Sequence, residues 1–141
     1  MSSPRSSPSL PDDVRAFLIK PNPAVIATVR RDGQPISVAT WYLLEDDGRI
    51  LVNMDEGRRR LSYLRNDPRV SLTVLADHNW YTHISIQGVA VLSDDEGLAD
   101  IDRLCRHYTG RPYPTRNRAR VNAYITIERL HRWGAIAIKP T

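Results

Sequence analysis

The sequence contains a single cysteine and no long apolar segment, and both absences narrow the possible classes of protein. Cys105 alone excludes an internal disulfide and a metal site built only from cysteines, and it suits a cytoplasmic chain. No apolar run approaches the roughly 20 residues that a membrane-spanning helix needs, so no membrane partner is expected. The four histidines are widely spaced, and we therefore expect no metal site.

The common sequence patterns of catalytic nucleophiles and nucleotide-binding loops are also missing. No Gly-x-Gly-x-x-Gly segment occurs, and no Ser–His–Asp or paired-carboxylate arrangement can be argued from the chain. The adjacent acids Asp46-Asp47 and Asp94-Asp95 are expected at a turn and at the start of a helix. The sequence therefore identifies no catalytic residue.

Composition predicts one folded domain. The chain has 141 residues, of which 41% are hydrophobic and 26% charged, which is enough for a single domain with its own core. Residues 1–9 are rich in serine and proline without an apolar segment, so they are expected to be a disordered tail and not a signal peptide. Residues 10–141 then form the domain.

An excess of positive charge leaves the type of partner open. The net charge of +4 and the pI near 9.6 permit nucleic-acid binding, but they favour a polyanionic small ligand equally well. The basic, proline-containing segment 111–120 has three interpretations: a solvated loop, which we favour, a nucleic-acid contact, or a contact with a polyglutamate tail or acidic substrate. We therefore do not favour nucleic acid as a partner.

The most informative segment is a run of three arginines, residues 58–60, directly after the apolar run Ile50–Met54. The arginines begin a short helix that must end near Asn66, because Pro68 disfavours the α conformation before it. The first turn of a helix already carries unpaired N–H groups and the positive end of the dipole. Adding Arg58 and Arg60 there predicts a phosphate pocket, and the alternative is a solvated basic turn.

Alternating and β-rich runs separated by turns predict a mainly β (α+β) fold. Helices are expected after Asp12, Arg58 and Ser93, and Gly88 is expected at a bulge or tight bend. Six or seven antiparallel strands with a few peripheral helices suggest a closed barrel. The expected strands are residues 24–30, 36–44, 50–54, 70–76, 81–92 and 121–127, with 135–138 closing the sheet.

Several segments, in this order, resemble the pyridoxamine 5'-phosphate oxidase-like (FMN-binding) split β-barrel family. The resemblance spans roughly residues 10–139 and is greatest for the flavin/deazaflavin oxidoreductases of the B type, which use coenzyme F420. The sequence departs from that of the oxidase itself at Trp133–Lys139, where the arginine-containing signature for pyridoxamine phosphate is absent. The segments that carry the resemblance are Ala24–Val29, Asp32–Pro35, Ser37–Thr40, Gly57–Arg60, Leu64–Val70 and Ile86–Ala90.

This resemblance implies a homodimer with two cofactor sites at the interface, and it assigns roles by position. Two arginines match the positions that hold the cofactor phosphate, and Pro35 with residues 37–40 matches the strand beside the tricyclic ring. Trp80 matches an aromatic residue that reaches the ring from the partner subunit. The cofactor-binding positions are Pro35, Ser37, Val38, Ala39, Thr40, Asn53, Met54, Arg58, Arg60 and Trp80.

The activity that the resemblance implies is hydride transfer between reduced coenzyme F420 and a small unsaturated organic acceptor. FMN shares the ring and the phosphate, so an FMN-dependent reductase or oxidase of the same fold is the first alternative. A dimer that binds flavin without turnover is the second.

Overall fold

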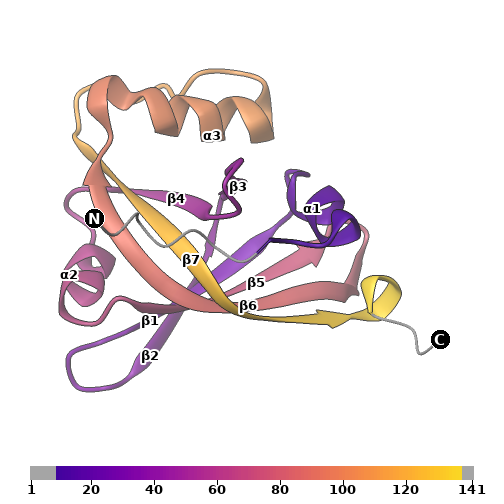
Figure 1. The fold of residues 1–141 in the computed structure, drawn as a ribbon. Coiled ribbons are helices and arrows are strands. Elements are labelled where there is room, and N and C mark those ends of the chain that lie inside the picture. Colours follow the sequence, from indigo (N-terminus) through magenta and orange to yellow (C-terminus); the bar gives the residue numbers. More distant parts are fainter. Residues whose placement is uncertain (1–8, 138–141) are drawn as a thin grey trace, which may run out of the picture.

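Seven strands form one antiparallel sheet in the order β2-β1-β5-β6-β7-β4-β3 in the computed structural model, which describes residues 9–137 (Figure 1). The predicted mainly β split barrel is confirmed, while the predicted tail lies, apart from Ser9, outside the described residues. The strands are β1 (Ala24–Val29), β2 (Pro35–Thr40), β3 (Leu43–Leu44), β4 (Ile50–Asp55), β5 (Arg69–Ala76), β6 (Asn79–Asp94) and β7 (Arg120–Trp133). The helices are α1 (Asp12–Leu18), α2 (Arg59–Asn66) and α3 (Ala99–Thr109), with short 3-10 turns η1 (Glu96–Leu98) and η2 (Gly134–Ile136).

The sheet curls until its two ends face each other without pairing. β2 and β1 stand at one end of the strand order and β4 and β3 at the other. Nevertheless, Ala24 and Ala39 from the first end line the same cavity as Asn53 from the second. A barrel that is open along one side results, and the opening is where the candidate site lies.

The expected long strand over residues 36–44 is in fact two strands. β2 pairs with β1, whereas β3 pairs with β4 at the opposite end of the sheet, so Trp41 and Tyr42 cross the opening between them. Tyr42 is fully buried, and its hydroxyl donates to the backbone oxygen of Lys20 and accepts from the amide of Asn22. Burial of this side chain and its hydrogen bonds therefore fix the crossing, which alternation in the sequence does not reveal.

β6 and β7 are long strands, and their pairing shifts register between Gln87 and Gly88, as expected for a bulge at this glycine. A Cβ atom added at Gly88 would lie 2.2 Å from the backbone oxygen of Thr126. Only glycine permits β6 and β7 to approach this closely. The inward side chains of both strands, such as Ile84, Ile86 and Ile125, belong to the buried core.

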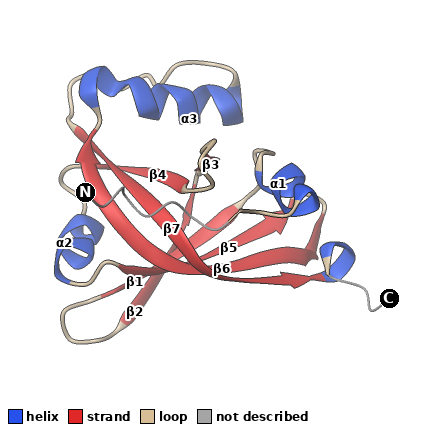
Figure 2. Ribbon diagram, in the orientation of Figure 1, coloured by secondary structure: helices blue, strands red, loops and turns tan. Residues whose placement is uncertain are grey.

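The three α-helices lie at the periphery of the curved sheet (Figure 2). α1 and α2 contribute buried residues to the barrel core, among them Leu18 and Leu61. α3 crosses the far side of β4 (Figure 1), where Ile101 and Leu104 form a separate cluster with Leu51. Although α2 contributes to the barrel core and α3 to the separate cluster, side chains of both helices line one cavity, among them Arg60 and Leu104.

The end of the chain differs from the expected closing strand. Gly134 has a positive φ of 73°, which favours glycine, and the turn η2 follows where residues 135–138 were expected to be extended. Residue 138 lies outside the described part of the chain. Within residues 9–137 we find no helix with the length and apolar character that crossing a membrane requires.

Candidate functional site

A cavity of about 500 Å3 occupies the opening of the barrel between α2 and α3. Ala24, Ala39, Trp41 and Leu104 supply part of its apolar lining. The polar lining comes from six side chains on β2, β4, α2, α3, the loop after α3 and β7. These are Thr40, Asn53, Arg60, Tyr108, Tyr113 and Arg120. We call this cavity the arginine pocket.

Arg60 carries the feature that most directly indicates a ligand. It lies in the first turn of α2, and its Nη1 atom is buried with no hydrogen-bond partner among residues 9–137. Burial lowers the pKa of Arg60, and the neighbouring charges of Arg58 and Arg120 lower it further. A buried guanidinium nitrogen without a partner is costly, so this arrangement fits an anion placed against it.

Arg58 is the residue that precedes α2, and its extended backbone (φ −72°, ψ 139°) separates it from the helical turn. The predicted end of this helix at Asn66 is confirmed. The first turn of α2 holds no acidic residue, although acids are favoured there. Arg58 is exposed and does not line the arginine pocket, whereas Arg60 is half-buried and lines it.

Arg120, at the start of β7, is a third arginine of the pocket that the sequence did not reveal as a site residue. Its Nε donates to Asn53 Oδ1 at 2.7 Å, and its Nη1 donates to the hydroxyl of Tyr113 at 3.3 Å. Its guanidinium also lies 4.7 Å from the centre of the Tyr113 ring. All of these partners are neutral, so the positive charge of Arg120 is not offset by direct contact with an acid.

Nearby arginines outside the pocket behave differently. Arg103, Arg116 and Arg118 each form an ion pair with a carboxylate at 2.6 to 2.8 Å. Within residues 9–137, no ion pair is found for Arg58, Arg60 or Arg120. Arg60 and Arg120 line the cavity without an ion pair, and Arg58 is close enough to lower the pKa of Arg60. Together they create a local positive potential that attracts an anion.

The residues predicted from β2 separate into three groups. Ala39 and Thr40 line the arginine pocket. Ser37 and Val38 are exposed on the edge strand and line neither of the two cavities described here. Pro35 lies at the other end of β2, beside a second cavity.

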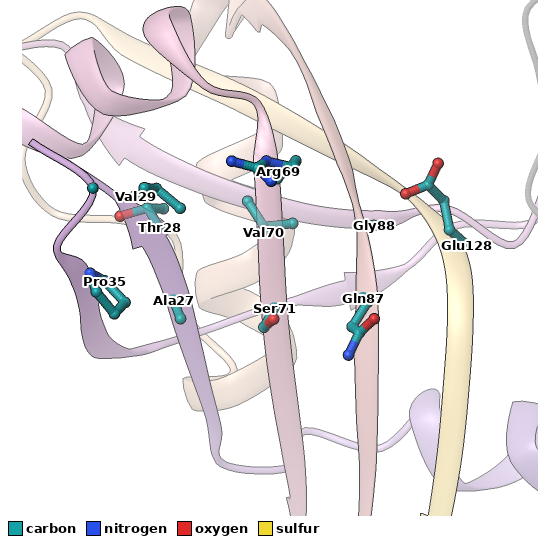
Figure 3. Close-up of a pocket in the computed structure, with 11 residues that line it drawn as sticks. Ala27, Thr28, Val29, Pro35, Arg69, Val70, Ser71, Gln87, Gly88 and Glu128 are labelled. Atoms are coloured by element: carbon teal, nitrogen blue, oxygen red, sulfur yellow. The ribbon is translucent and has the colours of Figure 1, made fainter. Parts of the chain in front are cut away.

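That second cavity, of about 440 Å3, lies at the end of the β1–β2 hairpin and reaches across β5 and β6 to β7. Figure 3 shows Pro35 on the hairpin side, Ser71 and Gln87 on the strands between, and Glu128 on β7. Its arginine, Arg69, is already paired with Asp67 at 2.6 Å. This cavity therefore lacks the uncompensated positive charge of the arginine pocket, which makes it the weaker candidate for a phosphate.

The remaining predicted residues lie in different environments. Asn53 lines the arginine pocket with its side chain fully engaged in hydrogen bonds. Met54 points the other way and is 1% exposed in the barrel core, so it supports the site from behind. Trp80 is 72% exposed and lines neither the arginine pocket nor the second cavity.

Trp80 instead belongs to an exposed aromatic patch at the far end of β6 and β7, formed by Trp80, Tyr81, His83 and Trp133. Tyr81 contacts both Trp80 and His83 edge to face, and His83 stacks on Trp133 with ring centroids 5.8 Å apart. In the part of the chain that the structure describes, no group of histidine, cysteine or acidic side chains could hold a metal ion.

Comparison with known proteins agrees with the observed fold. A family model described as pyridoxamine 5'-phosphate oxidase matches residues 10–134. A solved F420 reductase has a TM-score of 0.76 and 22% identity, over 86% of this chain and 98% of that chain. The conserved hypothetical protein Rv2991 from Mycobacterium tuberculosis has a TM-score of 0.69 and 26% identity, over 94% and 89% of the two chains.

General stress protein 26 from Bacillus anthracis also shares the fold, with a TM-score of 0.65 and 18% identity over 86% of this chain and 92% of that chain. A search of curated proteins finds no match. Similarities at these identities describe the shared architecture, so the ligand has to be argued from the pocket.

Proposed function

The chain belongs to the pyridoxamine 5'-phosphate oxidase family, and we propose that it is an oxidoreductase that holds the phosphate of a tricyclic redox cofactor in the arginine pocket. The cofactor that we propose is coenzyme F420, with FMN as the alternative. The family contains flavin- and F420-dependent oxidoreductases, and proteins of unknown function as well. The choice therefore depends on the residues of this chain.

One observation carries the proposal: the buried Nη1 atom of Arg60 has no partner, and Arg58 and Arg120 lie close enough to depress its pKa. A bound phosphate would supply the missing acceptor for Arg60, because phosphate oxygens accept charge-assisted hydrogen bonds from guanidinium groups. The helical N–H groups at the start of α2 supply further positive potential on the same side.

We propose that the ring of the cofactor lies along β2. The exposed side chains of this strand carry no charge and no aromatic ring: Pro35, Ser37, Val38 and Ala39. Thr40 continues the strand into the arginine pocket. A flat ring can approach a strand of this kind closely, and the phosphate would then reach Arg58 and Arg60 at the end of β4, which Asn53 and Met54 lead into.

The exposed edge strand and the aromatic patch support a homodimer as part of this proposal. Val38 on β2 and Trp80 on the patch are both large apolar side chains left exposed in one chain. Exposed apolar surfaces of this kind mark interaction sites, and isologous pairing of two copies would cover them. In such a pair, Trp80 would lie over the ring bound by its partner.

When bound, the cofactor supplies the hydride chemistry, and the protein supplies binding and orientation. Hydride transfer from a cofactor requires no protein nucleophile. The acceptor that we propose is a small unsaturated organic molecule. F420 is favoured over FMN because Arg60 and Arg120 in the pocket, with Arg58 close by, suit a polyanionic tail. One solved structure of this fold is also named an F420 reductase. The single buried, free cysteine is compatible with the cytoplasm, the location that we propose.

The decisive experiment titrates the purified protein with F420 and with FMN, followed by absorbance and fluorescence, and then assays each reduced cofactor with a panel of quinones, biliverdin and activated alkenes. Turnover that requires both a cofactor and an acceptor would support the oxidoreductase. Trp80→Ala should lower acceptor reduction and leave phosphate-dependent binding almost unchanged. Tight binding of either cofactor with no turnover would favour a flavin-binding dimer, and binding of neither would refute the proposal.

A further inference from the structure

A buried polar network lies behind the arginine pocket and connects its walls. Asn53 on β4, Asp95 before α3 and Asn122 on β7 are each no more than 9% exposed. Asn53 Nδ2 donates to Asp95 Oδ2 at 3.0 Å and to Asn122 Oδ1 at 2.7 Å. Asn122 Nδ2 donates in turn to Asp100 Oδ2 at 2.8 Å. One amide at position 53 therefore links two strands to the start of α3.

The chemistry of its neighbours fixes which way the amide of Asn53 points. A carboxylate can only accept hydrogen bonds, so the NH2 group faces Asp95. A guanidinium can only donate, so the carbonyl oxygen faces Arg120, whose Nε lies 2.7 Å away. Both amide hydrogens are used within the network, which leaves Asn53 no donor to offer a phosphate.

Asp95 is held equally firmly. Its Oδ1 accepts the backbone N–H of Asp100 at 2.8 Å, and its Oδ2 accepts that of Ile101 at 2.9 Å. Its own backbone N–H donates to the carbonyl oxygen of Arg120 at 3.0 Å. The carboxylate thus completes the first turn of α3, and the neutral amide of Asn53 stands between it and the guanidinium of Arg120.

We propose that Asn53 is a positioning residue that aims the guanidinium of Arg120 into the arginine pocket while keeping it out of direct contact with Asp95. A carboxylate at position 53 would pair with Arg120 and offset its charge, whereas the amide orients the guanidinium without offsetting it. The charge of Arg120 is then available to the phosphate. This inference deepens the proposed function and rests on it, because it concerns the same anion site.

The test is a double-mutant cycle in which the affinity for inorganic phosphate and for FMN is measured by calorimetry on the full-length chain. Arg120→Gln should weaken phosphate binding about tenfold or more, the scale of a hydrogen bond to a charged group. Asn53→Asp should cause a loss of similar size. In the Arg120→Gln background, Asn53→Asp should cause no further loss, because Asn53 acts through Arg120.

Asn122→Asp is the matched control: it makes the same substitution in the same network without touching Arg120. It should lower the melting temperature about as much as Asn53→Asp, yet change phosphate affinity less than about threefold. If Asn53→Asp fails to fold, Asn53→Ser takes its place, because its side chain is neutral and too short to reach Arg120. Its smaller loss should also vanish in the Arg120→Gln background.

Losses that multiply in the double variant, or equal losses of affinity from Asn53→Asp and Asn122→Asp, would overturn the inference and leave a structural role for Asn53. The proposed function is tested separately by Arg60→Gln. If Arg60→Gln and Arg120→Gln each weaken phosphate binding and Asn53→Asp does not, only the positioning role fails. If the wild-type chain binds neither phosphate nor FMN, both proposals fail.

Discussion

Replacing Arg60 with methionine should stabilise the ligand-free protein and weaken its binding of phosphate. Methionine keeps most of the length of the side chain and removes the guanidinium, whose Nη1 atom is buried without a partner. An unsatisfied buried donor costs about 1–3 kcal/mol, and repulsion by Arg58 and Arg120 adds to that cost. Because Arg60 is only half-buried, we expect a gain of about 1–2 kcal/mol.

For a chain of this length, such a gain should raise the melting temperature by about 3–8 °C in a buffer free of phosphate and sulfate. The same substitution removes charge-assisted hydrogen bonds to the ligand, so phosphate affinity should fall by about 1.5–3 kcal/mol. Saturating phosphate stabilises the wild-type chain by mass action. Its melting temperature should then approach or exceed that of the variant.

Differential scanning calorimetry with and without phosphate measures both effects in one experiment. Arg59→Met is the control, because Arg59 is an exposed neighbour in the same helix and should change stability by about 0.5 kcal/mol or less. A lower melting temperature for Arg60→Met in the ligand-free state would refute the reasoning. It would mean that the guanidinium already stabilises the empty fold and is not held in place for an anion.

Three further predictions concern assembly, packing and acid stability. The chain should sediment at about twice its 16.1 kDa mass, and Val38→Glu on the exposed edge strand should produce a monomer; a wild-type monomer at micromolar concentration would contradict the shared site. Gly88→Ala should lower the free energy of unfolding by about 3 kcal/mol or more in a denaturant titration, because its Cβ atom would lie 2.2 Å from the backbone oxygen of Thr126 on β7. A loss below about 1 kcal/mol would show that the two strands can separate there. The hydrogen bond and ion pair with Arg69 lower the pKa of Asp67 to about 2, below its value in the unfolded chain. The stabilisation by this pair should therefore be lost as the pH falls from about 4 to 2. Asp67→Asn should flatten the dependence of the melting temperature on pH over that interval, and an unchanged pH profile would contradict this.

Local patterns were sufficient to predict most of the fold. Alternation of apolar and polar residues located most of β6 and the first half of β7, which continues to Trp133 beyond the expected residues 121–127. Pro68 located the end of α2, and Gly88 marked the bulge. The arginine run likewise predicted a phosphate pocket, and the structure places Arg60 inside a cavity. Each of these signals depends on residues that are close together in the sequence, so it can be recognised without the structure.

Features that depend on long-range pairing were not predictable. Arg120 is at the end of a basic segment that was interpreted as a solvated loop, and only the pairing of β4 with β7 brings it to Asn53. The crossing at Tyr42 was missed for the same reason, because Asn22 and Lys20 lie about twenty residues earlier in the chain. No periodicity in the sequence reports such contacts.

The length of β7 determines which residues each copy would contribute to the two sites of a dimer. A strand advances about 3.3 Å per residue, so Arg120 and Trp133, at its two ends, lie on the order of 40 Å apart along it. The basic end and the aromatic end of β7 in one chain therefore belong to two different sites of the proposed dimer. In the proposed pair, the second residue of the shared site is Trp80, which lies in the same aromatic patch as Trp133. A copy defective in Arg120 combined with a copy defective in Trp80 would retain one intact site, while the second site would carry both defects.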